Sequence, residues 1–244
     1  MPKAPPDTHL WGYNGPLTAL RGGHRNSAFR TAIGHQPALV FKSSRRSAES
    51  LLWLEPVQAA AREAGFQVPK YVRSRRGHIL ENGWTCEPFI DGAEFTADRM
   101  PEVARRLKRF HEASTGIEQR PGFASSVELT TLQQGGDVDL SVMPTGLVAR
   151  LRDAWAGMPD GDQGVIHGDI GTGNLILTPS GQPALIDWDE ASADLRIFDT
   201  AQVVSDPPGN DIQRGLTAWE IACCWKLEPE RARSLAARHF GCDF

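Results

Sequence analysis

Apolar and polar residues follow strand-like patterns in the first ninety residues of the chain. An apolar run of strand length over 38–41 ends at Lys42, and a second strand-like segment over 84–90 is closed by an Asp-Gly turn. Between them we expect a helix from about Ser47, a favoured N-cap residue, to Ala64, where an alanine-rich stretch meets Gly65. Pro56 predicts a break or kink in this helix near Glu55.

Beyond residue 100 the apolar residues recur at helical spacing instead. Three stripes repeat at three- and four-residue intervals: Val103, Leu107 and Phe110; Leu147, Leu151 and Trp155; Ile212, Leu216, Trp219 and Cys223. We interpret them as core-facing sides of helices, expect His111 to be a packed side chain, and expect a charged final helix over 228–239. This part of the chain is therefore predicted to be mostly helical.

Short apolar runs return at 165–166, 175–177 and 184–186. A loop with three glycines separates the first two runs, and the turn-forming sequence 179–182 separates the last two. This order predicts a loop that enters a hairpin, with Asn174 at the start of one strand and Asp187 at the end of the other.

The polar residues of this segment suit phosphoryl transfer. His167, Asp169 and Asn174 stand in the order His-x-Asp-x-x-x-x-Asn, and Asp187 follows. A carboxylate such as Asp169 can take the proton of an attacking hydroxyl, while Asn174 and Asp187 offer the hard oxygen ligands that Mg²⁺ prefers. A surface hairpin with solvated acids would contain the same residue types, but all four at these positions favour a site.

The segments HGDIGTGN and LIDWDEA resemble the catalytic loop and metal-binding segment of the aminoglycoside phosphotransferase-like kinases. The resemblance implies an α+β, protein-kinase-like fold of two lobes: an extended segment over 1–19, a small β-rich nucleotide-binding lobe over 20–90, and a mostly helical catalytic and substrate-binding lobe over 91–244. It makes Asp169 the catalytic base and Asn174 and Asp187 the metal ligands. His167 would shape the loop, and Asp199 would support it from the following helix.

The same resemblance implies a nucleotide site in the first lobe. Gly22 and Gly23 resemble a loop whose backbone amides approach phosphates, although a glycine pair is more often a simple turn. Lys42 would place its ammonium on the phosphates, and the alternative is a strand-end lysine reaching water. Glu49 best resembles the helix glutamate that holds this lysine, with Glu55 in reserve; either can equally be an exposed acid.

Segments 68–73 and 78–80 would be the remaining strands of the first lobe, and 84–92 would be the hinge to the second. A hinge binds adenine mainly through backbone groups, so Glu87 and Phe89 would contribute by position. An ordinary strand closed by a turn describes the same residues without a ligand.

Composition limits the remaining function classes. The 244 residues include 26 Lys and Arg against 30 Asp and Glu, a net charge of −4, which argues against nucleic acid as the main partner. No apolar run reaches the length of a membrane span, and no hydrophobic signal-peptide core begins the chain, so we expect a cytoplasmic protein without membrane partners. The four cysteines lack paired spacing and are expected to be reduced thiols.

Together these features predict a Mg²⁺-dependent kinase that uses ATP or GTP and a small hydroxyl-bearing substrate. The alternative is a nucleotide-binding, pseudokinase-type regulatory module with little or no catalysis. Acids between Gly116 and Pro144 and at Asp160 and Asp162 are compatible with a cationic acceptor, or with a solvated loop. The acceptor, the preferred nucleotide and the oligomeric state stay open.

Overall fold

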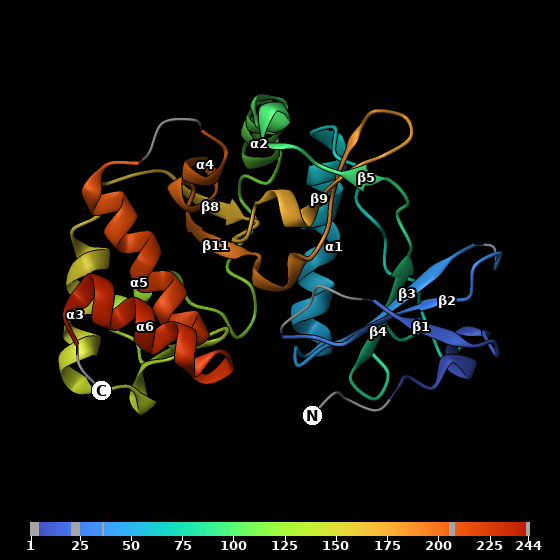
Figure 1. The fold of residues 1–244 in the computed structure, drawn as a ribbon, viewed down its shortest axis with the longest axis horizontal. Helices are drawn as coiled ribbons and strands as arrows, with labels where there is room; N and C mark the ends of the chain where they lie inside the picture. Colours follow the sequence, from blue (N-terminus) through green and yellow to red (C-terminus); the bar gives the residue numbers. More distant parts are fainter. Residues whose placement is uncertain (1–4, 21–24, 36, 205–207, 243–244) are drawn as a thin grey trace. The chain divides into compact units, whose positions relative to one another are not determined.

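The chain folds into two compact units (Figure 1). The structure is a computed structural model that describes residues 5–20, 25–35, 37–204 and 208–242. Unit 1 comprises Met1–Phe95 together with Leu175–Ile186, and unit 2 comprises Thr96–Asn174 and Asp187–Phe244. Residues 175–186 belong to unit 1, whereas the sequence prediction includes them in the second lobe, over 91–244.

A four-stranded antiparallel sheet is the centre of unit 1. Its strands, in spatial order, are β1 (Leu17–Ala19), β2 (Ala28–Thr31), β3 (Leu39–Ser43) and β4 (Trp84–Pro88). Side chains alternate between the two faces of a strand, so residues of odd number in β3 and even number in β4 share one face. That face carries a buried apolar cluster: Leu39, Phe41, Trp84 and Cys86, joined by Tyr13. The opposite face carries Lys42.

The helix of unit 1, α1 (Ala48–Glu63), begins as the sequence predicts, because the Ser47 side chain accepts a hydrogen bond from the N–H of Ser50. The predicted break at Pro56 is absent, because α1 continues through this residue. Proline removes the bond to the carbonyl four residues earlier, that of Leu52. Both residues are exposed, so water can bind that carbonyl and the helix continues.

A second, three-stranded sheet explains why 175–186 belongs to unit 1. Its order is β10 (Pro183–Leu185), β9 (Leu175–Leu177) and β5 (Ala93–Glu94). β9 and β10 form the predicted hairpin, in which Leu175 is opposite Leu185. Asn174 precedes the first strand and Asp187 follows the second, so both residues lie at the open end of the hairpin. Gln67 adds an isolated bridge to Ala184.

The expected strands at 68–73 and 78–80 are absent. Both segments are irregular, and isolated bridges occur only just outside them, at Gln67 and Glu81. Isolated backbone hydrogen bonds replace a strand ladder, such as the bond from the N–H of Val72 to the carbonyl of Cys86 at 2.8 Å. Pro69 has no backbone donor, and Gly77 turns the chain with a φ of +83°, so neither segment supplies a continuous row of paired amides.

Unit 2 is mostly helical, as predicted. Its helices are α2 (Met100–Ala113), α3 (Thr145–Ala156), α4 (Ile197–Val203), α5 (Asn210–Leu227) and α6 (Pro229–Phe240). Two short ribbons accompany them: β6 (Gln134–Gly135) with β7 (Val138–Asp139), and β8 (Gln163–Ile166) with β11 (Ser192–Leu195). Figure 1 shows α3, α5 and α6 packed together, and their buried residues form the main core.

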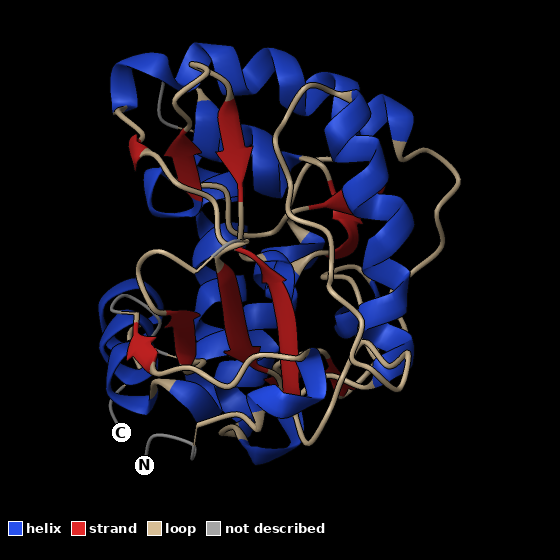
Figure 2. Ribbon diagram, turned by 90° about the vertical axis from the view of Figure 1, so that its right-hand side faces the viewer, coloured by secondary structure: helices blue, strands red, loops and turns tan. Residues whose placement is uncertain are grey.

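Single turns of 3-10 helix occur at Thr8–Trp11, Ala97–Arg99, Glu128–Thr130, Leu140–Val142, Thr172–Asn174 and Trp188–Glu190. Figure 2 separates the short strands, drawn red, from the helices. Within the described ranges, no helix is both long and apolar enough to cross a membrane.

Candidate active site

Asp199 of α4 holds the loop that follows β8. Its carboxylate accepts hydrogen bonds from the backbone N–H groups of His167 at 2.8 Å and Gly168 at 2.9 Å. Nε2 of His111, on α2, lies 3.1 Å from the same carboxylate, and both side chains are buried. Asp199 therefore fixes two consecutive amides of the loop from a helix packed behind it, and His111 is a packed residue.

Gly168 lets the loop pass close to neighbouring backbone. Its φ of +85° lies in the left-handed region, which favours glycine. A Cβ at this position would lie 2.9 Å from the carbonyl oxygen of Glu190. Any other residue would strain the loop immediately before Asp169.

Asp169, the predicted base, is exposed and held by two neighbours. Its N–H donates to Nδ1 of His167 at 3.3 Å. The Asn174 side chain donates through Nδ2 to the carbonyl oxygen of Asp169 at 2.9 Å and to its carboxylate at 2.8 Å. The His167 ring is buried against the indole of Trp188, with ring centroids 4.7 Å apart. These contacts place His167, Asp169 and Asn174 in one cluster.

Asp187 has an unusual backbone conformation. Its φ of +63° and ψ of +67° put it in the left-handed region, which aspartate tolerates better than most non-glycine residues. The Asp187 side chain is exposed, whereas Trp188 is buried and packs edge-on against Phe110. A strained backbone at an exposed carboxylate is common at functional sites, because the surrounding structure has to maintain it.

A buried arginine anchors the segment after Asp187. Nη1 of Arg120 donates to the backbone carbonyls of Trp188 at 3.3 Å, Asp189 at 2.9 Å and Ala191 at 2.9 Å. Arg120 is 1% exposed, and its guanidinium also stacks on the Phe123 ring. This residue could not be predicted from the sequence, since an isolated arginine beside a proline carries no pattern that marks it as buried.

The donor set of this cluster fits Mg²⁺. Asp187 supplies an exposed carboxylate, and Asn174 an amide oxygen whose partner nitrogen is already bonded to Asp169. Mg²⁺ on a nucleotide takes one or two protein oxygens and completes its shell with phosphates and water. No group of three or more His, Cys, Asp or Glu suited to a metal occurs among the described residues.

In unit 1, Lys42 pairs with Glu87 across the sheet. Nζ of Lys42 lies 2.8 Å from Oε1 of Glu87, and the side chains are 25% and 11% exposed. Beside them, burial raises the pKa of the Cys86 thiol to about 12, with the Glu87 charge adding to the effect. Glu87 thus contributes its side chain, whereas the predicted contribution was that of its backbone position.

The helix glutamates are placed differently from the sequence expectation. Glu55 forms an ion pair with Arg73, and Glu49 is exposed on the first turn of α1. Glu87, a carboxylate that contacts Lys42, comes from β4, because β3 and β4 are adjacent in the sheet. The predicted phosphate-loop residues Gly22 and Gly23 lie outside the described residues.

Phe89 follows β4 at the predicted hinge. Its N–H donates to the carbonyl of Ala38 at 2.8 Å, and the guanidinium of Arg30 lies 4.1 Å from the centre of its ring. Arg30 is opposite Val40 in the β2–β3 register, so it shares the sheet face of Lys42. The face thus combines cationic and aromatic groups beside the Lys42–Glu87 pair.

Two of the acids between Gly116 and Pro144 have structural contacts. Asp139 caps a 3-10 helix and binds Lys226 at 2.8 Å, which lowers the pKa of its carboxyl to about 2. Glu128 accepts hydrogen bonds from the N–H and hydroxyl of Ser125, and the backbone bond is the main reason that its pKa is lowered. These contacts remove both residues as indications of a cationic substrate.

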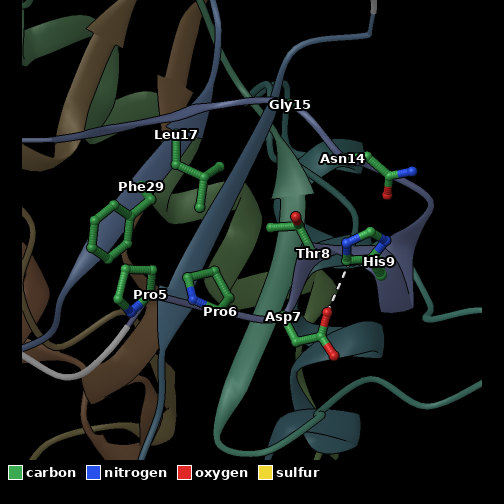
Figure 3. A pocket seen from close by; sticks show the side chains of 9 residues that line it. All are labelled: Pro5, Pro6, Asp7, Thr8, His9, Asn14, Gly15, Leu17 and Phe29. Atoms are coloured by element: carbon green, nitrogen blue, oxygen red, sulfur yellow. Dashed lines mark hydrogen bonds between the residues drawn. The ribbon is translucent and has the colours of Figure 1, made fainter.

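A hollow of about 450 Å³ lies elsewhere in unit 1 (Figure 3). Pro5, Pro6, Leu17 and Phe29 form one side of it, and polar residues including Asp7 and His9 form the other. Phe29 is opposite Phe41 in the register, so this hollow lies on the sheet face away from Lys42. It is not part of the Lys42 site.

Comparison with known proteins identifies the class of fold. Spectinomycin phosphotransferase in complex with ADP and spectinomycin has a TM-score of 0.55 at 11% identity, with 90% of this chain and 83% of that chain covered. An aminoglycoside phosphotransferase bound to AMP-PNP and hygromycin B has a TM-score of 0.56 at 12% identity, covering 95% and 94%. A macrolide 2′-phosphotransferase has a TM-score of 0.54 at 17% identity, covering 97% and 90%. The chain therefore has the protein-kinase-like fold of these enzymes.

The family assignment rests on the sequence itself. A profile of the phosphotransferase enzyme family matches residues 16–235, and the chain belongs to this family. No curated protein matches the chain. The predicted family, the α+β protein-kinase-like fold and the enzyme class, a phosphotransferase, are confirmed.

Proposed function

We propose that this protein transfers the γ-phosphoryl group of ATP or GTP to a hydroxyl group of a small molecule. Asp169 accepts the proton of the attacking hydroxyl, since it is an exposed carboxylate at the catalytic-loop position. Asn174 and Asp187 hold Mg²⁺ on the nucleotide, and Lys42 binds its phosphates. The Asp199 side chain holds the backbone N–H groups of 167–168, and the Arg120 side chain holds the backbone carbonyls of the segment after Asp187.

One observation carries this proposal: the candidate base and a candidate metal ligand are bonded side chain to side chain, at 2.8 Å, on a loop whose amides are fixed by a buried acid. Phosphoryl transfer depends on positioning and on charge neutralisation more than on covalent chemistry, so such a loop suits it. The bound cation supplies neutralisation of charge on the phosphates. ADP and AMP-PNP in the complexes of similar fold support a nucleotide donor.

The test compares wild type with Asp187→Asn in a thermal unfolding assay, with Mg²⁺-ATP, Mg²⁺-GTP or neither. A ligand at 100 times its dissociation constant stabilises the native state by about 2.7 kcal/mol. We expect a metal-dependent rise in the unfolding temperature of wild type that is reduced in Asp187→Asn. Asp153→Asn, an exposed acid on α3, is the matched control and should respond as wild type does.

Phosphoryl transfer itself is tested by incubating the protein with γ-labelled nucleotide and a fractionated metabolite extract. Label in a small molecule, absent with Asp169→Asn, supports the proposal. Nucleotide binding without transfer to any fraction would instead support a regulatory module of pseudokinase type. Absence of nucleotide binding contradicts both.

A further inference from the structure

The Lys42–Glu87 pair is built into the sheet rather than joined through a helix. In the β3–β4 register Lys42 is opposite Thr85 and Val40 is opposite Glu87, so the two charged residues are diagonal neighbours on one face. Diagonal partners lie within reach of long side chains, and the observed separation of Nζ and Oε1 is 2.8 Å. The backbone beneath both residues is a hydrogen-bonded ladder, which fixes their relative position.

Burial of the Glu87 side chain favours its ion pair with Lys42. The Glu87 side chain is 11% exposed, and a carboxylate this far removed from water needs a cation or strong donors nearby. Lys42 is the cation that the structure places there. An ammonium group has three donors, so a bond to Glu87 is compatible with simultaneous bonds to phosphate oxygens.

The glutamates of α1 have other surroundings. Glu55 is paired with Arg73, with side chains 44% and 38% exposed, and Glu49 is exposed at the start of the helix. A long lysine side chain has several rotatable bonds, so without a fixed partner its ammonium samples many positions. The 2.8 Å contact with Glu87 restricts the ammonium of Lys42 in this way.

We propose that Glu87 is the residue that positions the Lys42 ammonium for the nucleotide phosphates, a role that the sequence analysis gave to a glutamate of α1. The inference rests on the proposed function, because it concerns how Lys42 meets the nucleotide. Glu87 acts through Lys42 and is a positioning residue, not a catalytic one.

The experiment is a double-mutant cycle on Lys42→Met and Glu87→Gln, with Glu63→Gln, an exposed acid at the end of α1, as the matched control. Misplacement of a reacting or binding group by about 1 Å costs roughly 10²-fold, so we expect Glu87→Gln to lower kcat/KM for the nucleotide about 10- to 100-fold. Glu87→Asp should recover part of the loss. The kcat/KM of the double variant should equal that of Lys42→Met alone, because Glu87 influences the nucleotide only through Lys42. Far-ultraviolet circular dichroism and the unfolding temperature verify that each variant folds.

Three outcomes overturn the proposal. The first is a Glu87→Gln variant with the nucleotide kinetics of wild type. The second is a double variant whose losses multiply, which indicates a structural role independent of Lys42. The third is a loss of the same size in Glu49→Gln, which returns the role to the helix.

Failure of the proposed function gives a different result. A wild type that binds Mg²⁺-nucleotide but transfers no phosphoryl group contradicts the kinase function, and the same cycle is then measured on nucleotide dissociation constants by calorimetry. Coupling between Lys42 and Glu87 in those constants supports the positioning role, and its absence overturns it. A wild type that binds no nucleotide overturns both proposals.

Discussion

Asn174 donates its side-chain amide to both the backbone carbonyl and the carboxylate of Asp169, at 2.9 and 2.8 Å. The two residues are five positions apart and are joined by a loop with two glycines and one 3-10 turn. One amide group thus orients the proposed base with its nitrogen and would bind the proposed cation with its oxygen. The proton-accepting and metal-binding parts of the proposed site are therefore not independent.

Asp169→Asn removes the proton acceptor while keeping the shape of the side chain. We expect turnover to fall about 10²–10⁴-fold, the usual contribution of general acid–base catalysis, and nucleotide affinity to stay within about twofold. Steady-state kinetics and calorimetry measure the two quantities, with Asp153→Asn as the control. Unchanged turnover in Asp169→Asn would show that another group takes the proton.

Asn174→Leu removes the donor and the proposed metal ligand together. We expect it to lower turnover and, unlike Asp169→Asn, to raise the Mg²⁺ concentration that gives half-maximal activity. The physical reason is that the leucine side chain has neither the nitrogen bonded to Asp169 nor an oxygen for the cation. Activity is titrated against Mg²⁺ at saturating nucleotide. An Mg²⁺ requirement equal to that of wild type would remove Asn174 from the metal site.

Arg120→Lys keeps the positive charge but loses the planar fork that reaches the carbonyls of residues 188, 189 and 191. Hydrogen bonds to charged groups contribute about 1.5–3 kcal/mol, so we expect a loss of about 2–3 kcal/mol in the free energy of unfolding. Because the lost bonds hold the segment after Asp187, the Mg²⁺ requirement should also rise. Urea unfolding and an Mg²⁺ titration measure these effects.

Arg105→Lys is the control for this change, since Arg105 is exposed on α2. Arg105→Lys should alter neither the free energy of unfolding nor the Mg²⁺ requirement. If Arg120→Lys is destabilised but its Mg²⁺ requirement is that of wild type, then Arg120 supports the fold without influencing Asp187.

The sequence predicted those parts of the molecule whose structure follows from local pattern. The hairpin of β9 and β10, the N-cap at Ser47 and the buried stripes of α2 and α3 depend on neighbouring residues and on periodicity, and they are present. The buried side of α5 differs from the predicted stripe, of which Cys223 alone is buried, and Ala218 and Ile221 lie in the core beside it. The strands expected at 68–73 and 78–80 are absent, because continuous pairing depends on distant partners and Pro69 interrupts it.

Contacts between distant residues were the harder part of the site to predict. Arg120 reaches carbonyls about 70 positions away, and the side chain of Glu87 meets Lys42 only because their strands are neighbours in the sheet. A single sequence holds no local signal for either contact. Such contacts become visible only when the register and the packing are known.

Asp194 should make the stability of the protein depend on pH in a specific direction. It is 1% exposed, and burial raises the pKa of its carboxyl to about 6, even though it accepts bonds from Ser126 and from the N–H of Leu195. The folded state therefore holds the proton more tightly than the unfolded state does. The resulting stabilisation is fully present below about pH 4, the ordinary range of an aspartate, and is lost as the pH rises through 6.

The measurement compares wild type with Asp194→Asn, which cannot titrate at this position, by urea unfolding between pH 4 and pH 7.5. The other groups titrate in both proteins, so the difference in the free energy of unfolding isolates Asp194. We expect wild type to lose roughly 2–3 kcal/mol relative to the variant across this range, from a shift of about two pH units. A difference that is constant with pH would mean that the hydrogen bonds from Ser126 and Leu195 offset the cost of burying the charge.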